Sequence, residues 1–482
     1  MLFNSTDFAI FLPIVFLLYW FVANKNLKVQ NLLIVVASYV FYGWWDWRFL
    51  SLILFSTLVD YSVGRELEKQ ENPTKRKLLL WTSIIVNLGF LGFFKYYNFF
   101  LENFVNTFSF FGYPISPQGL NVVLPVGISF YTFQTLSYSI DTYKRKLKPT
   151  KDFIAFMAFV SFFPQLVAGP IERATHFLPQ FHKKRTFKYD KAVDGLRQIL
   201  WGLFKKIVIA DNAAQIANEI FNNSSNYSGS TLLLGALFFT FQIYGDFSGY
   251  SDIAIGTSRL FGFDLMQNFN FPYFSRDIAE FWRRWHISLS TWFRDYLYIP
   301  LGGSRGGIWM KVRNTFIIFI VIGFWHGANW TFIVWGVLNA AYFLPLLLLK
   351  KNRVNTNTVA ENNNLPSIKE FFQISVTFAL TILAWVFFRA ENLAHAFSYL
   401  STIFSNSLFT IPLFREMRHA LATILLILIF IFIEWIGRNE QFAIAKLGFT
   451  WKKPLRYAMY YSMILAIFLF MGKQQQFIYF QF

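Results

Sequence analysis

The sequence of 482 residues contains no cysteine. This absence excludes disulfide bonds, cysteine-ligated metals, lipid attachment through a thiol and any covalent intermediate on cysteine. Charged residues are also scarce: Asp, Glu, Lys and Arg make up 15% of the chain, against about 25% in soluble proteins. A chain so poor in charge is not expected to present the surface of a soluble domain.

Apolar and aromatic residues take the place of the charged ones. Hydrophobic residues account for 55% of the chain and aromatic residues for 21%, which is typical of a membrane protein. We expect an all-α fold, a polytopic transmembrane helical bundle of about 11–13 membrane helices, some re-entrant or interfacial, within a single membrane-embedded domain over residues 1–482. The expected spans lie near residues 7–24, 29–44, 47–64, 78–101, 120–141, 153–170, 230–256, 314–328, 331–349, 371–388, 420–437 and 457–472.

Acidic residues are rarer than basic ones, 26 against 44, which gives a net charge of +18. The chain has no nucleic-acid-binding motif, so we interpret the basic residues as markers of cytoplasmic loops that contact anionic lipid. Basic residues are concentrated in residues 65–77 and 144–151, whereas the loop around residues 102–118 has none. The positive-inside rule therefore places the first two loops in the cytoplasm and the third loop, like the amino terminus, outside.

One apolar run, FIIFIVIGFWHGANWTFIVW at residues 316–335, carries a single ionisable side chain near its middle, His326. An imidazole at that depth is expected to find a partner, line a wet cavity or take part in chemistry. Gly323 and Gly327 are four residues apart, so on a helix they would present one bare face to another backbone. The structural alternative is that His326 only bonds a neighbouring helix at this packing face.

Two further segments do not resemble ordinary spans. The stretch Leu196–Ala210 is amphipathic, with Lys205 and Lys206 in its middle. The stretch Phe281–Tyr296 is predicted to be one amphipathic helix at the interface or over a polar cavity, with His286 among its arginines. Residues 352–364, rich in Asn and Thr, are predicted to be a mobile linker.

A second polar cluster lies in FQIYGDFSGYSDIAIG at residues 241–256. Its carboxylates, Asp246 and Asp252, are costly in lipid and must face the protein interior. They either line a functional cavity or pair with Arg276, Arg283 or Arg284 to hold the bundle, and the sequence leaves both readings open. No spacing of His, Asp and Glu predicts a metal site.

Several long stretches resemble the membrane-bound O-acyltransferase (MBOAT) superfamily, and within it the bacterial alginate O-acetyltransferase type. They follow one another in the same order as in that family: LPVGISFYTFQTLSYSIDTY, FFPQLVAGPIER, FQIYGDFSGYSDIAIG, FWRRWHISLSTWFRDYLYIPLGG, GFWHGANW and AWVFFRA. The resemblance reaches from about residue 120 to 390, which implies an MBOAT core there, with flanking transmembrane helices in 1–119 and 391–482.

The resemblance implies that His326 and His286 are the catalytic histidines. It implies a central tunnel through the bundle, whose walls we assign to Asp246, Asp252, Asn329 and Trp325. Arg283, Arg284 and Arg294 are expected to bind the donor, although anchoring at the cytoplasmic surface is the plainer interpretation of most basic residues here. The donor implied is acetyl-CoA as a substrate, with no bound cofactor and no metal.

The resemblance further implies a bacterial cytoplasmic (inner) membrane protein that passes acetyl to an exported SGNH-type partner, which modifies an extracytoplasmic polysaccharide. Within the enzyme class, a D-alanyl transferase to teichoic acid, with a carrier protein as donor, remains an alternative. Outside it, a transporter also needs intramembrane polar groups. A non-enzymatic scaffold of a polysaccharide-export complex is a further alternative, and it would not need His326 in particular. The glycan acceptor is left open by the sequence.

Overall fold

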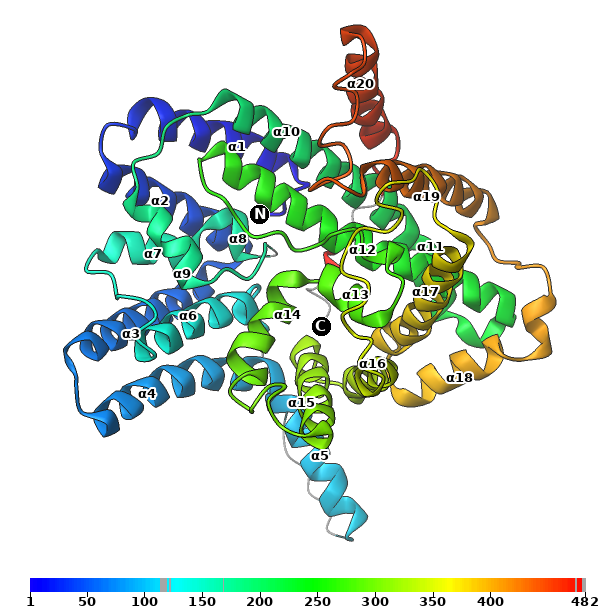
Figure 1. Cartoon of the computed structure of the whole chain (residues 1–482), viewed down its shortest axis with the longest axis horizontal. Helices are drawn as coiled ribbons and strands as arrows, with labels where there is room; N and C mark the ends of the chain where they lie inside the picture. Colours follow the sequence, from blue (N-terminus) through cyan, green and yellow to red (C-terminus); the bar gives the residue numbers. More distant parts are fainter. Residues whose placement is uncertain (113–118, 121–122, 168, 473–474, 479–482) are drawn as a thin grey trace. The chain divides into compact units, whose positions relative to one another are not determined.

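The computed structural model describes residues 1–112, 119–120, 123–167, 169–472 and 475–478, and no β-strand occurs in these ranges (Figure 1). The chain forms two compact units. Unit 1 comprises Met1–Ala192 and Thr257–Met266, and unit 2 comprises Val193–Gly256 and Gln267–Phe482. The all-α fold expected from composition is confirmed.

Several helices of unit 1 begin at side-chain caps. Asn72 caps Pro73–Leu91 by accepting from the backbone of Thr74 and Lys75, and Pro73 occupies the first helical position, where no N–H is needed. Three helices meet around the buried Asp60, whose carboxylate accepts hydrogen bonds from Ser83, Asn87 and Ser139. The helices of this unit are α1 (Thr6–Leu17), continued by η1 (Leu18–Val22), α2 (Leu27–Asp46), α3 (Leu50–Lys69), α4 (Pro73–Leu91), α5 (Tyr97–Phe110), α6 (Ile128–Tyr143), α7 (Phe153–Ser161), α8 (Phe163–Leu166) and α9 (Ala174–Phe177).

Unit 2 is organised around α12 (Gly229–Leu260), a long buried helix that continues into unit 1 at its last residues. Because Gly249 has no side chain, α12 can pack closely against the segment around Gly202. A Cβ at Gly249 would lie 2.8 Å from the carbonyl oxygen of Gly202. The other helices are α10 (Tyr189–Leu203), which starts in unit 1, η5 (Phe204–Ala210), α11 (Asp211–Asn222), α13 (Ile278–Arg284), α14 (Ile287–Phe293), η8 (Arg294–Tyr298), α15 (Ile308–His326), α16 (Trp330–Leu348), α17 (Ile368–Arg389), α18 (Leu393–Ile403), α19 (Met417–Gly437) and α20 (Lys453–Leu469).

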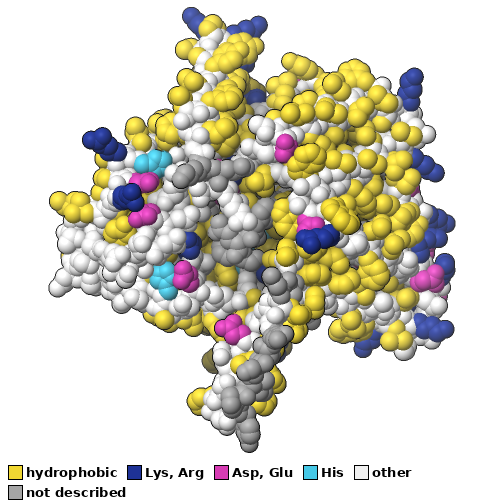
Figure 2. All heavy atoms as spheres, turned by 180° about the vertical axis from the view of Figure 1, so that it is seen from behind, with side chains coloured by type: hydrophobic (Ala, Val, Ile, Leu, Met, Phe, Trp, Pro, Cys, Tyr) yellow, Lys and Arg dark blue, Asp and Glu magenta, His cyan; other side chains and the backbone are white. Residues whose placement is uncertain are grey.

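Many of these helices expose apolar side chains. On α19 Leu421, Leu425 and Phe432 are more than half exposed, and Figure 2 shows many hydrophobic side chains gathered on the right part of the view, with Lys and Arg along its right edge. Such a surface suits lipid rather than water. Within the described residues, seven helical segments are long and apolar enough to cross a membrane: Leu27–Lys69, Pro73–Phe110, Gly229–Leu260, Ile308–His326, Trp330–Leu348, Ile368–Arg389 and Met417–Gly437. The chain is a multi-pass membrane protein. The expected total of about 11–13 membrane helices stays a prediction.

Two expected boundaries were wrong and one was confirmed. The helix before the loop at 102–118 continues to Phe110, and residues 113–118 of that loop lie outside the described residues. The break expected between the spans 314–328 and 331–349 is present, because the extended backbone of Gly327 separates α15 from α16. The segment 281–296 is not one helix, because the left-handed conformation of His286 (φ 44°) ends α13 and starts α14.

Candidate active site

His326 is the last residue of α15, directly before the break. The α15–α16 hairpin is tight because Gly323 faces the carbonyl oxygen of Phe332 and Gly336 faces that of Phe319, where any Cβ would collide. Gly323 therefore serves the close approach that the sequence predicted. Gly327 does not share a helical face with it, since Gly327 lies outside the helix.

The imidazole of His326 is enclosed by aromatic rings. Its ring centroid lies 4.9 Å from Trp325, 5.2 Å from Trp335 of α16 and 5.1 Å from Phe388 of α17, and the residue is 5% exposed. Side chains from three helices thus fix its position without any neighbouring charged group among these contacts. The mid-membrane depth expected for His326 stays a prediction.

His286 is held in place by a hydrogen bond to the side chain of Asn268. The Asn268 Oδ1 atom accepts a hydrogen bond from the backbone N–H of Ser288 (3.3 Å), which identifies it as the amide oxygen. Nδ1 of His286 lies 3.0 Å from the same oxygen and must therefore donate to it. This bond fixes the tautomer with the proton on Nδ1, so that Nε2 is the proton-accepting nitrogen.

Burial keeps His286 neutral. The residue is 1% exposed, and this desolvation lowers the pKa of His286 from 6.5 to about 3. Its left-handed backbone is uncommon for a residue with a side chain, and such conformations concentrate at functional sites. The spacing of apolar residues predicted that His286 lies on the polar face of a continuous helix. That spacing gives no information on the backbone dihedral angles, so the positive φ of His286 could not be predicted from it.

Both histidines contact the same indole. Trp325 lies 6.1 Å from His286 and 4.9 Å from His326, measured between ring centroids. Phe247 of α12 packs edge-on against His286 at 4.7 Å, so the stretch 241–256 does reach the pair as expected. We refer to His286, His326, Trp325 and Asn268 as the histidine centre.

The carboxylates of α12 have lysine partners rather than the arginines considered above. Asp252 lies 2.6 Å from Lys205, and Asp246 lies 2.7 Å from Lys206. Lys206 also contacts Asp211 at 2.7 Å. We refer to these five residues as the lysine–carboxylate centre. The lysines were visible in the sequence as two cations in an otherwise apolar stretch, a signal that demands buried acidic partners.

Asn329 holds the start of α16 in place, and its expected position in the tunnel wall stays a prediction. Its side chain caps α16 by accepting from the N–H of Thr331 (3.0 Å), and its amide donates to the carbonyl oxygen of Glu391 (2.8 Å). Asn268, by contrast, was not anticipated. It lies in an irregular stretch with no motif, and only the fold brings it to His286.

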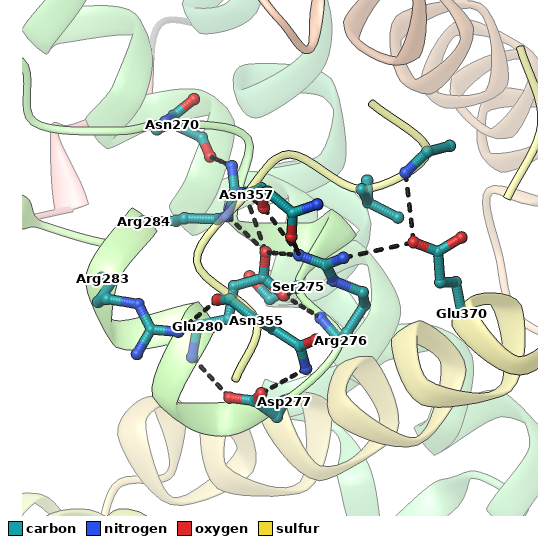
Figure 3. Close-up of polar contacts among 12 residues, drawn as sticks. Asn270, Ser275, Arg276, Asp277, Glu280, Arg283, Arg284, Asn355, Asn357 and Glu370 are labelled. Carbon is teal, nitrogen blue, oxygen red and sulfur yellow. Dashed lines mark hydrogen bonds and ion pairs between the residues drawn. The ribbon is translucent and has the colours of Figure 1, made fainter. Parts of the chain in front are cut away.

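Two of the expected donor-binding arginines are engaged in a polar cluster around α13 (Figure 3). Arg284 and Arg276 both bond the carboxylate of Glu280, at 2.9 and 3.0 Å, and both donate to the carbonyl oxygen of Asn357. Arg283 donates to the carbonyl oxygens of Asn352 and Asn355 at 2.9 and 2.6 Å. The segment 352–364 is therefore tied to α13, and its prediction as a free linker was wrong.

Arg294 is placed differently from the other two. It is paired with Asp295 at 2.7 Å with 58% of its side chain exposed, and it lines a cavity of about 230 Å³. Trp282, Phe319 and Ile322 form part of the same cavity. Trp282 is 5.6 Å from Trp335, which in turn contacts His326, so only two rings separate the cavity from that imidazole. Among the described residues, no three His, Asp or Glu side chains are grouped as a metal site would require.

A polytopic helical protein in which two buried histidines contact one indole has the make-up of a membrane-embedded acid–base enzyme. Residues 47–388 match the model of the MBOAT, membrane-bound O-acyltransferase family, and the chain belongs to this family. It is therefore an O-acyltransferase. The matched range includes both histidines and both polar centres.

Curated relatives span most or all of the chain. The "Probable alginate O-acetylase AlgI" of Pseudomonas aeruginosa is 41% identical over 410 residues, covering 84% of this chain and 75% of the relative. The protein of the same name from Pseudomonas putida is 38% identical over 505 residues and covers both chains entirely. The "Peptidoglycan O-acetyltransferase" of Helicobacter pylori is 34% identical over 530 residues, with 100% of this chain and 98% of the relative covered.

Proposed function

We propose that this protein transfers an acetyl group from a cytoplasmic thioester, acetyl-CoA, to serve the O-acetylation of a polysaccharide outside the cytoplasmic membrane. The observation that carries this proposal is the histidine centre, in which two buried imidazoles from different elements contact one indole. The named relatives act on alginate and on peptidoglycan. Acetyl transfer is their shared chemistry, and the glycan differs between them.

The catalytic step needs one base and one oriented hydroxyl. His326 takes the proton of the acceptor hydroxyl while its oxygen attacks the thioester carbonyl. The C–S bond then breaks, and the proton passes from His326 to the departing thiolate, which leaves as a free thiol. The imidazole ends the cycle neutral, as it began.

His286 is assigned to orient the acceptor. With its proton fixed on Nδ1 by Asn268, its Nε2 accepts a hydrogen bond and does not donate one. A nitrogen that accepts suits the hydrogen of the acceptor's hydroxyl group. In this neutral form the imidazole of His286 also adds no positive charge to the centre. Trp325, which touches both imidazoles, forms the wall of the proposed tunnel between them.

The cavity beside Arg294 is the proposed entrance for the donor. Arg294 and Arg353 line it, the loop before α15 carries Arg305, and the adjoining end of α15 carries Lys311 and Arg313. The positive-inside rule assigns such an end to the cytoplasm, where thioesters are made. Phosphate groups of the donor fit Arg294 and Arg353 better than Arg284, because the guanidinium of Arg284 already bonds Glu280.

Beyond the membrane, the proposed recipient is an exported SGNH-type partner that passes acetyl to the glycan. This step completes the transfer. The helices of this chain are largely apolar, so we expect another molecule to bind the glycan acceptor. A D-alanyl transferase to teichoic acid is the second candidate. The two differ in the donor, which is acetyl-CoA in one case and an aminoacyl carrier protein in the other.

The test is His326→Ala in membranes supplied with radiolabelled acetyl-CoA, with His182→Ala as a matched histidine control in unit 1. The base contributes about 100- to 10,000-fold, so His326→Ala should lose acetyl transfer and thiol release together while its accumulation stays normal. Wild-type transfer in this variant would refute the assignment. Transfer from an aminoacyl carrier protein, with none from acetyl-CoA, would select the second candidate.

A further inference from the structure

Unit 1 contains a basic cavity of about 430 Å³. Its lining brings together the end of η1, the segment 176–191 and residues 259–264, all within this unit. Against a single carboxylate, Asp264, the lining contains six cationic side chains: Lys183, Lys184, Arg185, Lys188, Lys191 and Arg259. The cavity is therefore strongly positive.

Defined contacts hold the walls together. The indole N–H of Trp20 donates to the carbonyl oxygen of Leu260 (3.0 Å), and the ring of Phe187 packs edge-on against Trp20 at 5.5 Å. Gln180 and Asp264 exchange two hydrogen bonds through side chain and backbone, each 2.9 Å long. The cavity is thus a built feature of the fold and not a gap between mobile side chains.

Not all of its cations are available to a ligand. Arg185 is buried and donates to Gln30 (3.2 Å) and Asn31 (2.6 Å), and Lys191 pairs with Asp264 at 3.0 Å. Lys183, Lys184 and Lys188 are exposed and take part in no ion pair with any described residue. Three lysine charges therefore face the cavity without compensation, which favours an anion there.

The surface next to the cavity is apolar. Leu17, Phe21 and Val22, on the same turns of α1 and η1 as Trp20, are 53%, 77% and 69% exposed. Lys25 and Lys28 follow directly, so the positive-inside rule places this end of α1 at the cytoplasmic leaflet. A ligand that fits both features carries a negative head and apolar tails.

We propose that this cavity binds the phosphate of an anionic phospholipid headgroup from the cytoplasmic leaflet. Lys183, Lys184 and Lys188 hold the phosphate, while the acyl chains lie along Leu17, Phe21 and Val22. A soluble phosphate compound shares the head chemistry but lacks the chains, and the two sources are separable by experiment. The site is independent of the histidine centre and of the acyl transfer proposed there.

The test measures lipid binding to the delipidated full chain in detergent by native mass spectrometry, with phosphatidylglycerol and phosphatidylcholine of identical acyl chains. The cavity variant is Lys183→Gln/Lys184→Gln/Lys188→Gln. The matched control is Lys144→Gln/Lys146→Gln/Lys148→Gln, which removes the same charge from exposed lysines predicted on the same membrane side but outside the cavity. Thermal unfolding of each variant checks that it is folded.

We expect the cavity variant to bind phosphatidylglycerol about tenfold or more weakly than wild type, and the control to bind like wild type. Phosphatidylcholine should bind weakly throughout. Equal losses in both variants would mean diffuse surface attraction and would overturn the site, as would no loss in either. Displacement of the lipid by micromolar inorganic phosphate or adenosine 3′,5′-bisphosphate would assign the cavity to a soluble ligand and overturn the lipid.

Discussion

The two polar centres of unit 2 both lie against α12, and they solve the problem of a buried polar group in opposite ways. In the lysine–carboxylate centre two lysines and three carboxylates pair with one another at 2.6–2.7 Å. In the histidine centre the two imidazoles are enclosed by the rings of Trp325, Trp335, Phe388 and Phe247. The first arrangement pairs its ionisable side chains with each other, whereas the second surrounds its two imidazoles with aromatic rings.

This difference predicts different consequences of mutation. Removing one partner of a buried ion pair leaves a lone charge, which costs about 3–5 kcal/mol, whereas removing both partners together is often nearly neutral. Removing a neutral imidazole leaves no charge behind. Mutations at the first centre should therefore reduce folded protein, and mutations at the second should reduce turnover of protein that is still folded.

The largest effect that sharpens this comparison is expected at His286. His286→Ala should lower acetyl transfer about 100-fold, and Asn268→Ala about tenfold, because the latter frees the tautomer but keeps the imidazole. Both should accumulate normally. The measurement is acetyl transfer per amount of accumulated protein, and a loss in proportion to accumulation would make the centre structural.

The next effect concerns the lysine–carboxylate centre. Lys205→Met should destabilise the protein by about 3–5 kcal/mol, since among the described residues Asp252 then keeps only its bond from Gln198 (2.7 Å). Lys205→Met/Asp252→Asn should recover most of the lost thermal stability in detergent. If the double variant were as unstable as the single one, the ion pair would not be the cause.

A pH effect on stability follows from the lowered pKa of His286. Below pH 6.5 the unfolded chain takes up a proton on this residue, whereas the folded protein does so only near pH 3. Stability should therefore fall as the pH drops through this window, by up to about 1.4 kcal/mol per pH unit. Thermal unfolding of His286→Asn between pH 4.5 and 7.5 should show a shallower slope than wild type, and His182→Ala should not. An unchanged slope in His286→Asn would contradict neutral burial.

The smallest effect is expected at the donor entrance. Arg294→Gln should raise the KM for acetyl-CoA a few-fold with little change in kcat, because Arg294 is exposed and acts only on the donor's phosphates. Arg305→Gln, which changes the same charge on the neighbouring loop outside the cavity lining, is the control. A similar KM for acetyl-CoA in both variants would contradict the proposal that the donor enters through this cavity.

The sequence predicted these centres unequally. Apolar length and the isolated His326 were sufficient to predict the helices and one catalytic candidate, because both are local properties of the chain. The partners of Asp246 and Asp252 were missed, since pairing with Lys206 and Lys205 depends on how α12 packs against η5. Periodicity also predicted one helix through His286, where a single positive φ makes two.

Local patterns failed in a second way at the loops. The Asn-rich segment 352–364 has the composition of a linker, but its carbonyl oxygens accept hydrogen bonds from Arg276, Arg283 and Arg284. Backbone acceptors are the same in every sequence, so composition carries no information on this use. The role of Asn268 was hidden for a different reason, because its side-chain oxygen reaches His286, 18 residues further along the chain, only through the fold.

The measurement that tests the account most directly compares two variants in one assay, His326→Ala and Lys205→Met/Asp252→Asn. For each, folded protein in the membrane and acetyl transferred from acetyl-CoA are determined side by side. The account predicts normal accumulation with almost no transfer for the first, and near-normal transfer per folded molecule for the second. Transfer retained in His326→Ala but lost in the folded double variant would place the chemistry at the lysine–carboxylate centre and contradict the account.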